Sequence, residues 1–179
     1  MTAEEGKRTR ETIEMASETD IPVTVKGLIP TPTGCGVFLS NGEKVIAIFV
    51  DHSVAAAITM FLHQIKKPRP LTHDLIASIF AGLGVSVQKI VINDLQGDTF
   101  FARLFLIQEN ELGKHLVEID ARPSDSIALA LQQSCPVFVV KHVWDRAEDM
   151  TWALEQATQK EDSLGDDLDR GADGEQEEA

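Results

Sequence analysis

The sequence predicts an α+β fold, with a mixed, largely antiparallel sheet, three short core helices and a weaker C-terminal helix. Segments with apolar residues at helical spacing are interspersed with runs rich in β-branched residues. The connections between the later β-rich runs are short, which favours antiparallel neighbours. The chain has 179 residues, a length that accommodates one domain with its own core.

The first predicted strands lie in the N-terminal part of the chain. Residues 23–29 form a β-rich run that ends in a turn-forming Pro/Thr/Gly segment at 30–34. Residues 37–40 and 44–50 flank Asn41-Gly42, a pair that favours a hairpin turn. Residues 45–50 are almost entirely apolar, so we expect that strand to be buried on both faces.

Helices and further strands follow. The apolar spacing predicts a helix that is capped by Asp51 or Ser53 and ends before Pro68, a second from Thr72 to Gly84, and a third from Ser124 to just before Pro136. Strands are predicted at 85–92, 100–107, 116–121 and 137–140, with loops at 93–98 and 109–114. A weak, mostly polar helix is expected at 146–160.

Charge divides the chain into four parts. The formal net charge is -13, but the predicted domain at 21–144 holds ten acidic and ten basic residues. We interpret 1–20 as a disordered lead-in, 145–160 as the weak polar helix and 161–179 as an acidic disordered tail that could meet a basic partner. The neutral middle excludes a nucleic-acid binder that relies on one broad basic surface.

Other classes are excluded by composition and by missing motifs. No stretch reaches the ~18 apolar residues of a membrane helix, so no membrane partner is expected. The N-terminus lacks an apolar signal region, and the two cysteines make no disulfide framework, which favours a cytoplasmic protein. The sequence has no P-loop, dinucleotide fingerprint or zinc-ligand spacing.

Two predicted helix starts share one pattern of side chains. Each has an arginine, a proline, a hydroxyl at the expected N-cap and an aspartate in the first turn. They are Arg69-Pro70-Leu71-Thr72-His73-Asp74 and Arg122-Pro123-Ser124-Asp125. Each precedes an apolar helix and then a strand, an order that indicates a degenerate internal repeat.

These starts are suited to phosphate. The first N–H groups of a helix are unpaired and carry partial positive charge, so they attract anions. Arginine adds a planar, bidentate clamp for the same anion. We therefore expect Arg69, Thr72, Arg122 and Ser124 to bind phosphate, with both helix starts facing one cleft and gripping one phosphodiester.

Catalysis needs further groups at the same place. His73 could move a proton near neutral pH, and Asp74 and Asp125 complete the catalytic candidates. Asp74, Asp120 and Asp125 could hold a hydrated Mg²⁺ or Mn²⁺. The alternative interpretation is structural: the hydroxyls only cap their helices, and Arg122 pairs with Asp120 or Asp125.

Three runs of sequence resemble the bifunctional nuclease domain family. They are PRPLTHDL (68–75), GDTFFARL (97–104) and IDARPSDSIALAL (119–131), and the likeness covers about residues 22–143. The resemblance implies an α+β fold that forms homo-oligomers, and cleavage of both RNA and DNA. Relatives carry a glutamate where this chain has Val54, and Asp51 could substitute for it.

Two functions follow from the residues and the resemblance together. The first is a nuclease, a phosphodiester hydrolase acting on RNA and DNA, in which a divalent metal (Mg²⁺ or Mn²⁺) could assist. The second is a non-catalytic domain that binds a phosphate-bearing ligand or regulates a partner. The predicted helix starts are compatible with both functions. Convergence of the arginines, His73 and the aspartates on one concave surface would favour the nuclease.

Overall fold

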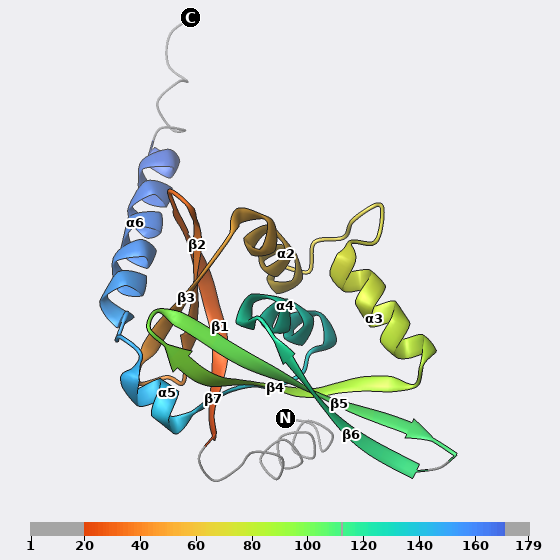
Figure 1. Ribbon diagram of the computed structural model, residues 1–179. Helices are drawn as coiled ribbons and strands as arrows, with labels where there is room; N and C mark the ends of the chain where they lie inside the picture. The colour runs from red at the N-terminus through yellow and green to blue at the C-terminus, as the bar shows by residue number, and fades with distance from the viewer. Residues whose placement is uncertain (1–19, 112, 171–179) are drawn as a thin grey trace, which may run out of the picture.

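A single mixed sheet forms the centre of the molecule (Figure 1). The computed structural model describes residues 20–111 and 113–170. The strand order is β3-β2-β1-β7-β4-β5-β6. The strands are β1 (Asp20–Thr31), β2 (Gly34–Ser40), β3 (Val45–Val50), β4 (Val85–Gln96), β5 (Thr99–Asn110), β6 (Gly113–Ala121) and β7 (Val137–Val140). Only β4 and β7 pair in parallel among these strands, so the α+β prediction with a largely antiparallel sheet is confirmed.

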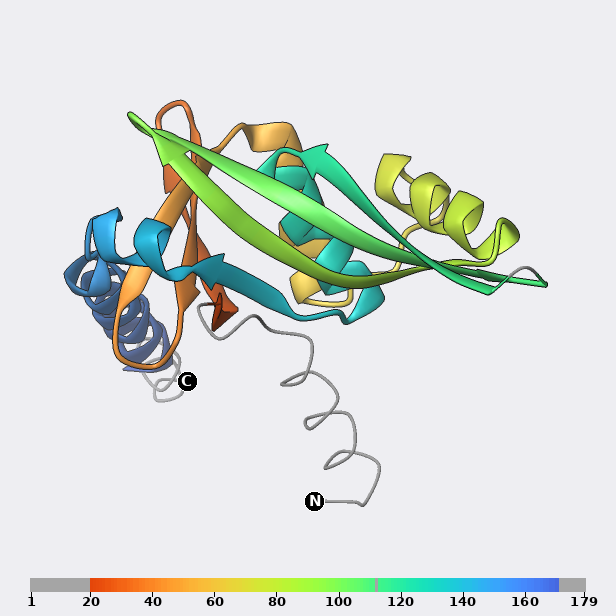
Figure 2. The same ribbon diagram turned by 60° about the horizontal axis from the view of Figure 1, so that its bottom comes forward.

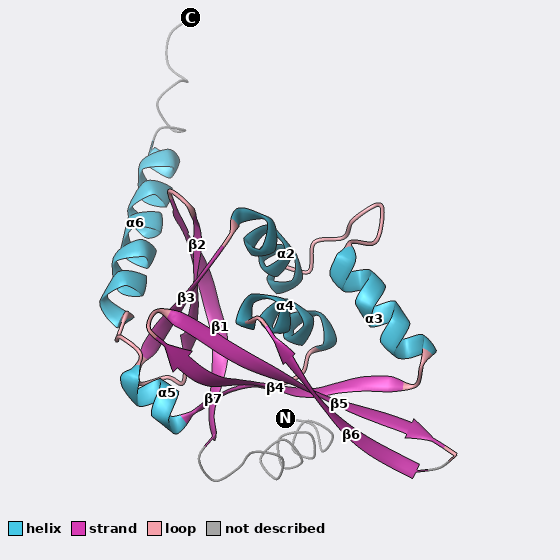
Figure 3. Ribbon diagram, viewed as in Figure 1, coloured by secondary structure: helices cyan, strands magenta, loops and turns pink. Residues whose placement is uncertain are grey.

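The helices lie on both sides of this sheet (Figure 3). They are α2 (His52–Leu62), α3 (Thr72–Gly82), α4 (Pro123–Gln133), α5 (Lys141–Arg146) and α6 (Thr151–Arg170). Helices α2 and α4 pack on each other and on the central strands, and α3 packs beside α4. The turned view in Figure 2 shows α5 and α6 at the opposite end of the molecule from α3.

The hairpin of β2 and β3 is buried on both faces, as its apolar run predicts. Ile46 and Ile48 point into the main core, to which α2 contributes Val54 and Ile58. Val45 and Ala47, on the other face, belong to a smaller cluster with Phe38 that is covered by Met150 and Leu154 from the start of α6. Phe49 is the exception, because its side chain is 67% exposed.

Several boundaries differ from the predictions. Strands β4 and β5 run through most of the loop predicted at 93–98, leaving a turn at Gly97-Asp98, where Gly97 adopts the left-handed conformation (φ 58°). Strands β5 and β6 likewise take up most of the loop predicted at 109–114. The helix predicted at 146–160 begins later, at Thr151, and continues to Arg170 as α6, and the separate short helix α5 occupies Lys141–Arg146 before it.

The ends of the chain are described only in part. Helix α6 enters the region for which we predict an acidic disordered tail, and the rest of that tail, 171–179, lies outside the described residues. Most of the predicted lead-in, 1–19, also lies outside them. Within residues 20–111 and 113–170, the helices lack the length or the apolar character that crossing a bilayer requires.

Strand β6 forms the outer edge of the sheet. Residues 113–120 are exposed where they are described, including Leu116 (65%), Val117 (41%) and Ile119 (41%). Lys114, Glu118 and Asp120 add charges along the same strand. Figure 1 shows β5 and β6 extending as a twisted ribbon beyond the helices, so one edge of this strand has no neighbour in the protomer.

Candidate active site

Three helices meet at His73. This residue lies in the first turn of α3 and is 9% exposed. Its Nε2 atom is 3.8 Å from Oδ1 of Asp125 in the first turn of α4. The ring of Phe61, at the end of α2, meets the imidazole edge-on with 5.9 Å between ring centroids. The two predicted helix starts therefore lie next to each other.

Asp125 connects this buried histidine to an exposed arginine. Nε of Arg122 donates to Asp125 Oδ2 at 2.7 Å, and Nη2 donates to Oδ1 at 3.1 Å. The hydrogen bond and the charge of Asp125 raise the pKa of Arg122 above its usual value. These bonds use Nε and Nη2, and Nη1 makes no hydrogen bond with the described residues. The pairing of Arg122 with Asp125 is the one that the structural alternative predicts.

A cavity of about 300 Å³ opens beside Arg122. It lies between the start of α2, the start of α4 and the β4–β5 turn, and we call it the cleft. Arg122 and Ser124 line one side, and Asp51, Asp98 and Phe100 line the others. Asp98 is exposed and makes no hydrogen bond or ion pair with the described residues. The cleft therefore holds a guanidinium that is bonded to Asp125 and a carboxylate that has no partner in the described part of the chain.

Asp51 has a structural role in the cleft wall. Its Oδ1 accepts hydrogen bonds from the backbone N–H groups of Ser53 (2.9 Å) and Val54 (3.0 Å), and from the Ser53 hydroxyl. The Ser53 hydroxyl first, and then the Val54 amide, lower the pKa of Asp51. The residue thus caps α2, one of the two caps that the sequence predicts, and its charge faces the same cavity as Arg122.

A second cavity, of about 330 Å³, lies at the other end of α2. Lys66, Lys67, Arg69 and Asp74 line it, and we call it the basic pocket. The Nζ atom of Lys67 is buried and has no hydrogen-bond acceptor among the described residues. It lies 4.7 Å from the centroid of the Phe61 ring, a cation–π contact. A buried ammonium without an acceptor is costly, and an anion in this pocket would provide one.

Asp74 takes a different position from the one we predict. Its Oδ2 accepts from the backbone N–H of Leu71 at 2.7 Å, and its Oδ1 accepts from Nε2 of Gln132 at 2.6 Å. The carboxylate therefore joins the start of α3 to the last turn of α4. Asp125 lies at the other end of α4, so these two aspartates do not act at one point.

Several of the predicted site residues are not brought together. Arg69 lines the basic pocket and Arg122 lines the cleft, so within the protomer the two arginines face different cavities and not the single cleft that we predict. Thr72 and Ser124 are not N-caps, because Leu71 and Arg122 occupy those positions. Ser124 is buried at the cleft wall, and Thr72 is exposed in the first turn of α3.

The predicted metal ligands do not fit one ion. Asp120 lies on the exposed edge strand β6, with Arg103 of β5 as its register partner. Asp125 is bonded to Arg122, and Asp74 is bonded to Gln132. Within the described part of the chain, no three His, Cys, Asp or Glu side chains are grouped so that they could hold a metal. No catalytic step through a metal is derived from these three residues.

The residue patterns did not predict a binding or catalytic role for two residues of this site, Asp98 and Lys67. Asp98 follows Gly97 in the tight β4–β5 turn, and that turn brings its carboxylate to the cleft. Lys67 belongs to the basic cluster that adjoins Arg69 in the sequence, but its burial depends on Phe61. The only available signal for Asp98 is its place in the run GDTFFARL.

Comparison with known proteins gives a family match and several relatives. The model of the bifunctional nuclease domain matches residues 37–151, which is more than half of the chain. An uncharacterised protein of Mycobacterium tuberculosis is 39% identical over 108 residues, which are 60% of this chain and 62% of that protein. A protein of Oryza sativa subsp. indica named bifunctional nuclease 1 is 24% identical over 104 residues, which are 58% of this chain and 31% of that protein. The matched parts thus span about three fifths of the mycobacterial relative and under a third of the rice protein.

Proposed function

Because the chain belongs to the bifunctional nuclease domain family, we propose that it is a nuclease that hydrolyses phosphodiester bonds of RNA and DNA in the cleft. One observation carries the proposal: the Arg122 guanidinium is held by Asp125 beside a cavity that also contains the Asp98 carboxylate, which has no partner within residues 20–111 and 113–170. The rice relative is named as a nuclease, which supports the same assignment.

Each side chain of the cleft has a role in this proposal. Nη1 of Arg122 and the Ser124 hydroxyl bind the non-bridging oxygens of the scissile phosphate. Asp98 accepts a proton from the attacking water, whose oxygen forms the new bond to phosphorus. The bond from phosphorus to the leaving oxygen breaks, and that oxygen takes a proton from solvent.

His73 and Asp125 act through Arg122. Because His73 is buried, its imidazole contacts Asp125 and not the cleft. The two residues fix the orientation of the Arg122 fork, so they are positioning residues. In this proposal, His73 does not touch the substrate.

The basic pocket binds a second phosphate of the same strand. The cleft is at the first residue of α2 and the basic pocket is at its last turn. An 11-residue helix is about 16 Å long, so the two sites are a few nucleotides apart on an extended strand. Lys66, Lys67 and Arg69 supply the local positive charge that the neutral domain lacks elsewhere.

The test compares cleavage by the wild type with that by Asp98→Asn and Arg122→Ala. Labelled RNA, single-stranded DNA and duplex DNA are incubated with Mg²⁺, with Mn²⁺ or with EDTA, and these arms also test the predicted metal requirement. We expect Asp98→Asn to lower kcat by about 10²- to 10⁴-fold. Glu43→Gln, in the exposed β2–β3 turn, is the matched control and should cleave like the wild type. Equal cleavage by all four proteins would refute the proposal.

A second candidate function is supported by the state of Arg122. Asp125 neutralises part of its charge, and a binding domain needs no reactive group beyond such a clamp. Phosphate-dependent binding of oligonucleotides by a protein that never cleaves them would identify a non-catalytic domain. In that case Lys67→Met and Arg122→Ala would both weaken binding, and Asp98→Asn would not.

Strand β6 supports the expected self-association. We propose that it pairs antiparallel with β6 of a second copy, because it has an unpaired edge and exposed Leu116, Val117 and Ile119. With Val117 on the two-fold axis, Lys114 faces Asp120 of the other copy. Sedimentation should give twice the chain mass of 19.6 kDa for the wild type and a monomer for Val117→Lys. The same mass for both proteins would refute the pairing.

A further inference from the structure

A third cavity, of about 490 Å³, adjoins the cleft. It shares Phe49, Asp98 and Phe100 with the cleft, so the two cavities lie side by side, and we call them together the groove. Its remaining wall comes from the end of α5 and the start of α6, with Arg146 and Trp152. We call this cavity the aromatic cavity. Its volume lies in the range of small-molecule sites, about 300 to 1,000 Å³.

Two aromatic rings are exposed in this cavity. The Phe49 side chain is 67% exposed, although the four residues before it in β3 are buried. Trp152 is 56% exposed at the start of α6, whereas Trp144 is 6% exposed in the core. Exposed rings of this size in one concave site mark a binding surface more often than a structural one.

The ring of Phe49 lies next to the neighbouring strand β2. Gly36 is its register partner in β2. A Cβ atom at Gly36 would lie 3.4 Å from Cε1 of Phe49, so the ring lies close to the bare glycine backbone. A ring with a strand against one side has fewer orientations to lose when a flat ligand stacks on it.

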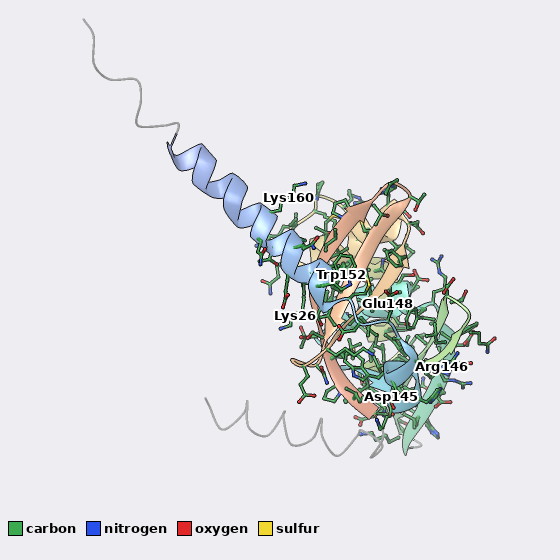
Figure 4. The ribbon with its side chains drawn as sticks, turned by 90° about the vertical axis from the view of Figure 1, so that its left-hand side faces the viewer. Lys26, Asp145, Arg146, Glu148, Trp152 and Lys160 are labelled. Carbon is green, nitrogen blue, oxygen red and sulfur yellow. The ribbon has the colours of Figure 1, made fainter. Side chains whose placement is uncertain are left out.

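The charges of the aromatic cavity favour a base over a phosphate. Arg146 is exposed. The hydrogen bonds that Asp94 accepts are the main cause of the lowered pKa of its carboxyl, and the charge of Arg146 lowers that pKa further. Glu148 and Asp98 offset Arg146 on the cavity wall. Figure 4 shows Arg146, Glu148 and Trp152 on the same face of the molecule. A strand in this groove would leave its phosphates at Arg122 and place its uncharged bases against the rings.

We propose that the aromatic cavity binds unpaired bases of single-stranded nucleic acid by stacking on Trp152 and Phe49. The inference rests on the proposed function, because it takes the cleft as the site of the scissile phosphate. Base faces are accessible in a single strand, but they are covered by neighbouring base pairs in a duplex. The stacking is tolerant of sequence, since every base has a flat π-face.

Trp152 itself reports on this binding. In Trp144→Phe, Trp152 is the remaining tryptophan, because the chain has two. Its emission is titrated with three cleavage-resistant phosphorothioate oligonucleotides: a single strand, the same sequence as a duplex, and an abasic strand of equal length. We expect quenching and a spectral shift with the single strand alone. Equal quenching by the abasic strand would show a phosphate site and would overturn the stacking proposal.

Affinity measurements give a second test that does not depend on Trp144→Phe folding. Fluorescence anisotropy with a labelled single strand should show binding about 5- to 150-fold weaker for Trp152→Ala, because one stacked base contributes that factor. Trp152→Phe keeps a ring and should bind within a few fold of the wild type. Leu83→Ala removes a similarly exposed side chain (61%) from the far end of α3 and should bind like the wild type. An unchanged Kd for Trp152→Ala would overturn the proposal.

The two proposals fail in different experiments. If the protein binds and quenches as expected but never cleaves, the nuclease assignment fails and the aromatic cavity stands. If Asp98-dependent cleavage is observed but Trp152→Ala leaves both Kd and KM for single strands unchanged, the aromatic cavity fails and the nuclease assignment stands. Where both hold, Trp152→Ala should raise KM for single strands with little change in kcat.

Discussion

Replacing Asp74 with alanine should remove two connections at once. The carboxylate accepts from the N–H of Leu71 at the start of α3 and from Gln132 in the last turn of α4. The first bond resembles a helix cap, worth about 1 kcal/mol. The second has a charged acceptor and contributes about 1.5 to 3 kcal/mol. Asp74→Ala should therefore lower the free energy of unfolding by about 2.5 to 4 kcal/mol, or Tm by about 5 to 16 °C.

Asp74→Asn separates this structural role from a catalytic one. The Oε1 atom of Gln132 is buried and has no hydrogen-bond partner among the described residues. If the Gln132 amide turns over, Oε1 can accept from the new asparagine, whose own oxygen still accepts from Leu71. We expect Asp74→Asn to lose less than half of the stability that Asp74→Ala loses, and to keep the wild-type kcat for cleavage.

The measurement is urea unfolding of the wild type, Asp74→Ala, Gln132→Ala and the double variant. The double-mutant cycle should give a coupling energy of about 1.5 to 3 kcal/mol between the two side chains. A coupling near zero, or an Asp74→Ala variant as stable as the wild type, would refute the structural role. Loss of cleavage by Asp74→Asn at full stability would restore a catalytic role for this carboxylate.

Three further predictions concern other parts of the fold. Gly34→Ala should destabilise the protein by about 1 to 3 kcal/mol, because a Cβ there would clash with the carbonyl oxygen of Val50. Gly82→Ala is the control, because it has open space around it and should be neutral or stabilising in the same unfolding assay. Burial raises the pKa of Cys135 to about 12, so the native protein should resist alkylation there at pH 8 and react only when unfolded; rapid labelling of the native thiol in mass spectrometry would contradict this. The lowered pKa of Asp51 means that its cap stabilises the fold above the ordinary carboxyl pKa and is lost as pH falls through the lower folded pKa. The wild type should therefore lose more stability than Asp51→Asn between about pH 5 and 3, and parallel losses would refute the cap.

Periodicity and turn chemistry were sufficient to predict most of the fold. The Asn41-Gly42 hairpin, the helix capped by Asp51 and the apolar stripe of α4 depend on neighbours within a few residues. The length of β4 and β5 does not depend on such local neighbours. Asn93 and Asp94 are poor strand formers, and the long pairing of the two strands keeps them in the sheet. Tertiary pairing overrides local preference there.

The candidate site was predictable only in part for the same reason. The sequence placed a hydroxyl at each helix start, but Leu71 and Arg122 are the extended residues that precede the helices. Which carboxylate a side chain meets depends on how α3 crosses α4, and this crossing sends Asp74 to Gln132 and leaves Asp125 near His73. No spacing in the sequence encodes that crossing.

The exposed charges of β6 bear on how variants of Asp120 are interpreted. An open edge strand with apolar side chains on both faces is a template for uncontrolled aggregation, and charged residues on such an edge oppose it. Removing the charge of Asp120 takes away one of these residues. A drop in activity for Asp120→Asn can therefore reflect precipitated protein, and light scattering of the same sample distinguishes insoluble enzyme from inactive enzyme.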